Sequence, residues 1–160
     1  MEQQLRTESQ HVSHELWSEL RPPSPEAGAV VVWEGEPSTP AEVTAGRRQL
    51  KRAVLQGQTP AGADEDDVER LLLAFEELAS NGLRHGGAPV RAAVTRTADG
   101  WLIDVTDAVA DRVPTPAVDR DPAHGGLGLY LVARLGAAHG WWRQPDHKHV
   151  WARIRAGGAV

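Results

Sequence analysis

Glu76-Glu77-Leu-Ala-Ser-Asn81-Gly-Leu-Arg-His-Gly86 is the stretch around which the rest of the chain can be interpreted. Residues four apart in an α-helix project from the same face, so Glu77 and Asn81 would lie together. Such a pair can hold a metal ion and position a water, although it is also common on solvated helices. The neighbouring apolar residues recur at helical spacing and predict a buried opposite face: Leu71, Leu72, Phe75, Leu78 and Ala79. The stretch therefore predicts a core helix with a narrow polar stripe.

The composition narrows the class of protein. A chain of 160 residues is long enough for one domain with a single hydrophobic core. It contains no cysteine, which excludes disulfides, thiolate metal sites and a cysteine nucleophile. The net charge of -5 argues against direct nucleic-acid binding, and no apolar run approaches the roughly 20 residues that cross a membrane. We therefore expect a cytoplasmic protein that acts on proteins or small molecules and has no membrane partner.

Local patterns on either side of this helix predict an α+β fold. Four acidic residues, 64–67, open the helix, which is expected to end near His85-Gly86-Gly87, where a glycine can close it in the left-handed conformation. The remaining predicted elements are a strand at 29–33, a helix from Thr39 to about Gln56, a hairpin of strands 90–95 and 101–106, a helix after Gly128, and strands at 141–144 and 150–154. This order predicts a mostly antiparallel sheet covered by helices.

The domain is expected to span residues 28–156. Residues 1–27 are interpreted as an N-terminal tail or linker, because the proline-rich segment 21–25 stops the loose amphipathic helix that could form before it. Residues 157–160 form a short C-terminal tail. The segment 108–124 has no clear periodicity and is predicted to be a long loop, a feature that is often a lid or binding loop.

Three separated elements favour the same chemistry. A helix start containing Gly126 and Gly128 offers backbone N–H groups and a positive dipole end to a phosphate. Asp107, at the end of a strand, can accept a hydrogen bond from an exocyclic amine. Asn81 offers an oxygen to magnesium, which usually retains waters and phosphate oxygens besides one or two protein ligands. Together with Glu77, these residues predict a magnesium-nucleotide site.

These motifs resemble the Bergerat-type ATPase and kinase superfamily, which includes DNA gyrase, sensor histidine kinases and anti-sigma-factor serine kinases. The stretch from Glu77 to His85 is similar to its N box, Asp107 to its adenine-reading aspartate, and Gly126-Leu127-Gly128 to its second glycine box. The resemblance covers about residues 28–156 and is greatest to the bacterial anti-sigma-factor kinases. It implies a two-layer α/β sandwich, a mixed, mostly antiparallel sheet and an ATP lid in the long loop.

The resemblance also implies roles for single residues, with ATP and Mg²⁺ as cofactors. Glu77 would be the general base, Asn81 the magnesium ligand and Asp107 the adenine contact. The remaining nucleotide contacts would come from the N box and the glycine box, namely His85, Gly125, Gly126, Leu127, Gly128 and Leu129. Arg112, Arg120 and His124 lie in the predicted lid, where they are either phosphate contacts or exposed loop residues. The implied partners are a sigma factor, an anti-sigma-factor antagonist and a second copy of the chain in a homodimer.

One departure from the family pattern leaves two functions open. The family has glycines directly after the aspartate, whereas Asp107 is followed by Ala108, Val109 and Ala110. The intact Glu77 favours a serine/threonine kinase that phosphorylates an antagonist and sequesters a sigma factor. The missing glycines favour a non-catalytic protein-binding switch with a degenerate nucleotide site. A histidine-kinase catalytic domain is a weaker interpretation, because no helical hairpin with a phosphoacceptor histidine precedes the domain.

Overall fold

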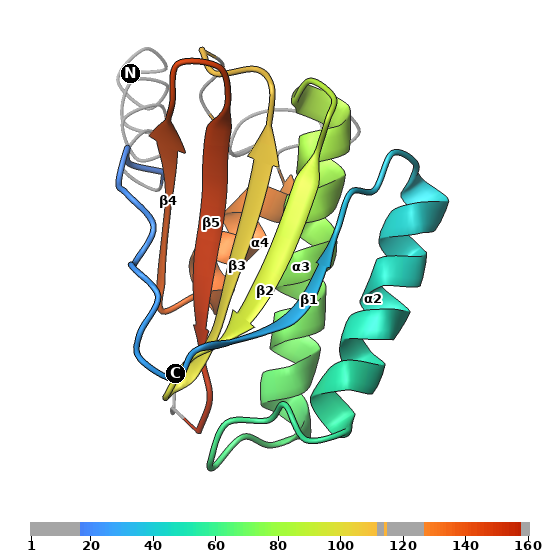
Figure 1. The fold of residues 1–160 in the computed structure, drawn as a ribbon, viewed down its shortest axis with the longest axis vertical. Coiled ribbons are helices and arrows are strands. Elements are labelled where there is room, and N and C mark those ends of the chain that lie inside the picture. Colours follow the sequence, from blue (N-terminus) through green and yellow to red (C-terminus); the bar gives the residue numbers. More distant parts are fainter. Residues whose placement is uncertain (1–16, 112–113, 115–126, 158–160) are drawn as a thin grey trace, which may run out of the picture.

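The computed structural model describes residues 17–111, 114 and 127–157. Within them, five strands form one sheet in the order β1-β2-β3-β5-β4, and three helices lie on one side of it (Figure 1). The elements are β1 Val30–Gly35, α2 Pro40–Leu55, α3 Glu65–His85, β2 Arg91–Arg96, β3 Gly100–Asp107, α4 Leu127–Leu135, β4 Ala138–Arg143 and β5 Lys148–Arg155. All pairings between these strands are antiparallel. The predicted α+β sandwich is confirmed.

The helix α3 is the central element of the helical layer. It packs on β3 and β5, α4 packs on β4 and β5, and α2 lies against β1 and α3. The side of α3 that faces the sheet contains the apolar residues predicted to be buried, and all five are at most 1% exposed: Leu71, Leu72, Phe75, Leu78 and Ala79. Because this face is removed from water, the position of α3 is fixed along its whole length.

Both long helices begin with a capping box, and the one at Thr39 is the cap that the sequence predicts. The Thr39 hydroxyl accepts a hydrogen bond from the Glu42 N–H at 3.2 Å, and the Glu42 carboxylate accepts one from the Thr39 N–H at 3.0 Å. Asp64 and Asp67 exchange the same pair of bonds at the start of α3, each at 2.9 Å. Side chains thus satisfy backbone donors that have no partner inside the helix.

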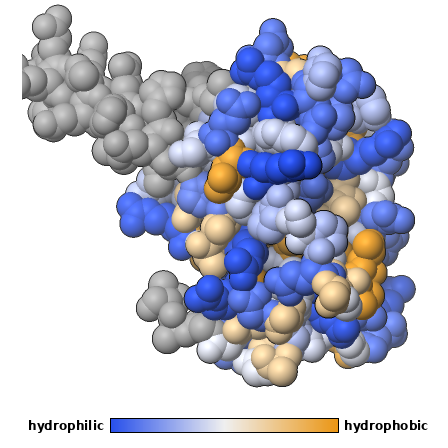
Figure 2. Space-filling view, turned by 60° about the vertical axis from the view of Figure 1, so that its left-hand side comes forward, coloured by the Kyte–Doolittle hydropathy of each residue, from blue (hydrophilic) through white to orange (hydrophobic). Residues whose placement is uncertain are grey.

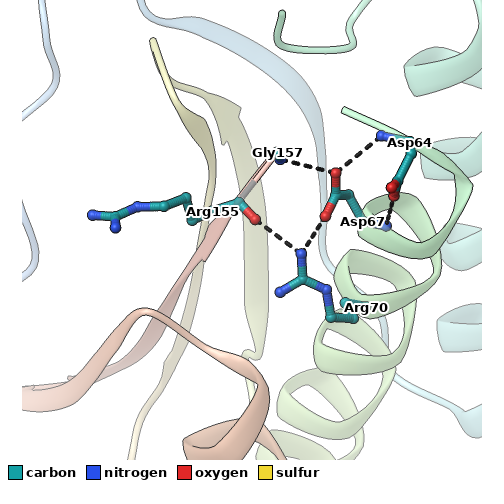
Figure 3. Close-up of polar contacts among 5 residues, drawn as sticks. All are labelled: Asp64, Asp67, Arg70, Arg155 and Gly157. Atoms are coloured by element: carbon teal, nitrogen blue, oxygen red, sulfur yellow. Dashed lines mark hydrogen bonds and ion pairs between the residues drawn. The ribbon is translucent and has the colours of Figure 1, made fainter. Parts of the chain in front are cut away.

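Asp67 also ties the start of α3 to the chain after β5 (Figure 3). Its carboxylate is 4% exposed and accepts a further hydrogen bond from the Gly157 N–H at 2.9 Å. The Arg70 guanidinium contacts the same carboxylate and donates to the Arg155 carbonyl at 3.1 Å. A single buried carboxylate therefore joins two segments that are far apart in the sequence.

Replacing Asp67 by Asn is expected to lower the free energy of unfolding at neutral pH by about 2–3 kcal/mol. The reason is that the variant lacks the buried negative charge that accepts hydrogen bonds from the Asp64 and Gly157 N–H groups and from Arg70. Burial by itself raises the pKa of Asp67, but hydrogen bonds from Gly157, Asp64 and Arg70 outweigh it and hold the pKa below its ordinary value. The stabilisation is therefore present above the unfolded-state pKa and is lost as the pH falls through the folded-state pKa.

Urea unfolding of the wild type and the Asp67→Asn variant from neutral to acidic pH measures this effect. The difference in stability should be largest near neutral pH and should shrink as the pH falls. Asp66→Asn is the matched control, because Asp66 lies in the same turn but is exposed. An equal loss of stability in the control would contradict a specific role for Asp67.

The conformation predicted for the end of α3 is wrong. Gly86 follows α3 with φ of -90° and ψ of 168°, which is an extended conformation and not the left-handed one. Residues 17–20, which the sequence analysis places in the tail, pack on the domain. Trp17 is 3% exposed, Glu19 forms an isolated bridge with Trp141, and the Leu20 N–H donates to the Trp141 carbonyl at 2.7 Å. Apolar burial and edge pairing beside β4 hold this segment, while residues 1–16 lie outside the described part.

The described surface has little concentrated apolar area. Three large apolar side chains are more than half exposed, and they lie in different parts of the chain: Leu20, Val31 and Leu55. On the face shown in Figure 2, the hydrophobic spots are separated by hydrophilic residues. Among the described helices, none has the length and apolar character needed to cross a membrane.

Candidate functional site

The polar stripe of α3 lies at the margin of the core. Glu77 and Asn81 occupy consecutive turns of the helix, and both are half-buried. His85, one turn further along, is the last residue of α3 and is half-buried as well. The helix thus presents a carboxylate, a carboxamide and an imidazole where the apolar layer meets the surface.

The first turn of α4 lies directly against Glu77. A methyl group placed on Gly128 would overlap the Oε2 atom of Glu77 and would lie 2.9 Å from its Cδ. Only glycine leaves room for the carboxylate in this position. The first turn of a helix has unpaired backbone N–H groups and a positive dipole end, which favour an anion such as phosphate. The fold therefore joins the predicted base to the predicted phosphate cradle, although about 50 residues separate them in sequence.

The residues around Glu77 shift the pKa of its carboxyl group. Burial is the main cause and raises the pKa of the carboxyl group above its ordinary value. The positive charge of Arg84 opposes this shift, while the neighbouring charge of Glu76 adds to it. A raised pKa brings a carboxylate closer to the proton affinity that a general base needs near neutral pH. Such shifts gather at functional sites, although structural carboxylates show them too.

Asp107 lies at the end of β3 on the buried side of the sheet, and it is 2% exposed. The end of α3 packs closely against it: a methyl group on Gly86 would lie 2.5 Å from both the Cβ and the Cγ of Asp107. The Ala108 N–H donates to the Gly87 carbonyl at 2.8 Å. These contacts fix Asp107 at the same end of the domain as the last turns of α3 (Figure 1).

The turn after Asp107 forms without glycine. The Val109 N–H donates to Oδ1 of Asp107 at 2.9 Å, which is the bond that an aspartate makes to its own backbone two residues on. No residue other than glycine has a positive φ anywhere in the described ranges, so Ala108, Val109 and Ala110 need no left-handed conformation. The departure from the family pattern therefore causes no backbone strain at this turn.

A lysine that the sequence analysis did not select completes the surroundings of Asp107. Lys148, the first residue of β5, is opposite Asp107 in the strand register and donates to its Oδ1 at 2.9 Å. Strand alternation could have revealed it, because Val150, Ala152 and Ile154 are buried core residues and Lys148 is in phase with them. A buried cation in phase with a core face is a signal of a buried anion.

The other predicted site residues have mixed outcomes. Leu129 is 2% exposed and packs in the core, and its carbonyl accepts a hydrogen bond from the Trp17 indole at 3.3 Å. Leu127 is the first residue of α4, and its side chain is outside the described part of the structure. The remaining predicted residues of the glycine box and the lid also lie outside it: Gly125, Gly126, Arg112, Arg120 and His124.

A cavity of about 520 Å³ lies at the same end of the sheet. Its lining consists of Pro89, Arg91, Thr106, Asp107, Ala108, Asp146 and His147. None of these residues comes from α3 or α4, so this cavity does not contain the pair formed by Glu77 and Gly128. Asp107 and Ala108 thus lie between this cavity and the end of α3.

The donor set suits magnesium held partly by a nucleotide. In the described ranges, no group of three or more histidine, aspartate or glutamate residues could hold a metal ion on its own. Asn81 supplies a hard carboxamide oxygen, and phosphate oxygens and waters would complete the octahedral shell that magnesium prefers. The backbone N–H groups in the first turn of α4 would hold these phosphates, and the absence of a side chain at Gly128 lets that turn approach the carboxylate of Glu77 closely.

Comparison with protein-family models identifies the family of this domain. A family model described as a histidine kinase-like ATPase domain matches residues 37–154. This range includes α2, α3, α4 and strands β2 to β5, and therefore contains all the predicted site residues. A comparison with curated proteins gave no match.

Proposed function

Because the chain belongs to the histidine kinase-like ATPase domain family, we propose that it binds ATP with Mg²⁺ and transfers the γ-phosphate to a protein hydroxyl. The acceptor would be a serine or threonine of an anti-sigma-factor antagonist. In this proposal the protein is a serine/threonine kinase that acts in partner switching, where it also sequesters a sigma factor. The sequence resemblance to anti-sigma-factor kinases is the basis for these partners and for a homodimer.

The position of Glu77 beside Gly128 is the observation that carries the proposal. A general base must reach the hydroxyl that attacks the phosphate, and the phosphate must be held at the same place. The close approach of the Glu77 carboxylate to Gly128 in the first turn of α4 supports this arrangement. The raised pKa of Glu77 supports the same role, because it makes the carboxylate a better proton acceptor.

Each remaining residue has a role in holding the nucleotide. Asn81 would be the magnesium ligand, and the bound ion would neutralise charge on the phosphates. The first turn of α4 would hold the phosphates with backbone N–H groups. Asp107 would accept a hydrogen bond from the adenine amine, and the contact of Gly86 with its side chain keeps it in place. Glu77 would take the proton of the attacking hydroxyl.

A second candidate function is a non-catalytic switch that binds a partner protein. One observation favours it: Oδ1 of Asp107 already accepts hydrogen bonds from Lys148 and from the Val109 N–H. Part of the carboxylate that would recognise adenine is therefore engaged within the protein. In this alternative, nucleotide binding would be weak or absent and no phosphate would be transferred.

Addition of ATP with Mg²⁺ is expected to raise the melting temperature. A ligand that binds only the folded state at 100 times its Kd adds about 2.7 kcal/mol, which corresponds to a rise of about 5–10 °C for a domain of this size. The rise should be lost on chelation of magnesium and should be much smaller in Asn81→Ala. The neighbouring half-buried Ser80 provides the control variant, Ser80→Ala.

The thermal measurement separates the two candidates from each other. An unchanged melting temperature at millimolar Mg-ATP would contradict nucleotide binding and favour the partner-binding switch. A rise without transfer of labelled phosphate to purified antagonist proteins would instead retain the nucleotide site and reject the kinase.

A further inference from the structure

Lys148 and Asp107 form an ion pair in the interior of the protein. The residues are 3% and 2% exposed, and the lysine Nζ lies 2.9 Å from Oδ1 of the aspartate. They face each other across the antiparallel pair of β3 and β5. Burying two charges is costly unless they are paired and hydrogen-bonded, so an arrangement of this kind needs good geometry to persist.

The lysine also holds the turn that follows Asp107. Its Nζ donates a second hydrogen bond to the Val109 carbonyl at 2.9 Å, and the Val109 N–H donates to Oδ1 of Asp107 at 2.9 Å. Lys148, Asp107 and Val109 are thus joined by three hydrogen bonds. Since all three involve either Oδ1 or the backbone of the turn, the rotation of the aspartate side chain is restricted.

The second carboxylate oxygen differs from the first in its contacts with the described residues. Oδ2 of Asp107 makes no hydrogen bond with any residue in the described part of the chain, whereas Oδ1 accepts two. On the other side, the close packing of Gly86 against the Cβ and Cγ atoms prevents the side chain from moving toward α3. Among the described residues, the carboxylate is therefore held through Oδ1 alone.

We propose that Lys148 is a positioning residue for base recognition. It anchors Oδ1 of Asp107 and the Val109 carbonyl, so that Oδ2 is the oxygen that accepts a hydrogen bond from the 6-amino group of a purine. Lys148 itself does not touch the nucleotide. The inference rests on the proposed binding of ATP at this site, and it predicts which purines the site accepts: those with an amine at position 6 in preference to those with a carbonyl oxygen there.

The test compares ATP with inosine triphosphate, which has an oxygen in place of the 6-amino group. We expect the wild type to bind ATP about ten- to a hundredfold more tightly, because a hydrogen bond to a charged group is lost in the analogue. In Lys148→Met, which has a side chain of similar length without the charge, the ratio of the two Kd values should fall below about threefold. Lys51→Met is the matched control, because Lys51 is exposed on α2, and it should retain the wild-type ratio.

The ratio of Kd values separates positioning from stability. A purely structural role would weaken both nucleotides equally and leave the ratio unchanged in Lys148→Met, which would overturn the inference. If Lys148→Met does not fold, Lys148→Gln takes its place, and its ratio of Kd values should lie below that of the wild type. An unchanged ratio in Lys148→Gln would overturn the inference. Failure of both variants to fold would also overturn it, because Lys148 would then serve stability alone. Wild type that binds neither nucleotide instead contradicts the proposed function itself.

Discussion

Replacement of Glu77 by Gln is expected to lower the rate of phosphate transfer by about 10²–10⁴-fold, the usual contribution of a positioned general base. ATP binding should change little, because the glutamine has the same size and the phosphates are held by other groups. The measurement is transfer of radiolabelled phosphate from ATP to a purified antagonist protein, with binding followed separately by calorimetry. Equal transfer by the variant would show that Glu77 is not the base.

Glu76→Gln is the matched control for this variant. Glu76 lies beside Glu77 in sequence, but its side chain is 43% exposed and forms an ion pair with Arg47 at 3.4 Å. An exposed pair of this kind contributes little, so the control should keep its rate within about twofold of the wild type.

Comparison of the wild type with Glu77→Gln also tests the pH dependence of phosphate transfer. A base acts in its deprotonated form, and burial raises the pKa of Glu77. The wild-type rate should therefore fall as the pH falls through this raised pKa, at a higher pH than an ordinary glutamate would give. The residual activity of Glu77→Gln should lack this acidic limb.

Gly128→Ala is expected to lower transfer by about 10²-fold or more without unfolding the protein. The added methyl group would overlap Oε2 of Glu77, which is the end of a flexible side chain and can move away. The carboxylate would then lose its place beside the first turn of α4. Thermal melting should show a small change in stability, while the transfer assay shows a large loss of rate.

A double variant separates this mechanism from a general disturbance of α4. If Gly128→Ala acts by displacing the Glu77 carboxylate, adding it to Glu77→Gln should lower the residual transfer rate of that variant only slightly further. The two losses would then be strongly non-additive. Independent, additive losses would contradict the displacement of Glu77 as the cause.

Much of the architecture could be predicted because it depends on local patterns. The cap at Thr39, the acidic first turn of α3, the period of its apolar residues and the Asp99-Gly100 turn each specify an element from a few neighbouring residues. The site residues on α3 followed from the same helical spacing. Where residues 17–20 pack could not be predicted, since a single apolar Trp17 does not indicate which surface it will cover.

Glycines illustrate the limit of local reasoning within the site. The sequence predicts that Gly86 ends α3 by its conformational freedom, but the structure has it extended and uses its small size against Asp107. Gly82 is similar, because a methyl group there would lie 3.2 Å from Cγ1 of Val105 in β3. Both reasons depend on a neighbouring strand and are therefore invisible in the helix sequence.

The sequence alone determined the order and type of the elements, the polar stripe of Glu77 and Asn81, and the strand-end position of Asp107. Only the tertiary structure brought Glu77 against Gly128 and placed Lys148 on Asp107. The physical reason is that periodicity and capping act over a few residues, whereas a contact between distant segments is set by how whole elements pack. The polar stripe on α3 is thus a local property of the chain. The chemistry that it can take part in depends on α4 and β3, which the fold places beside it.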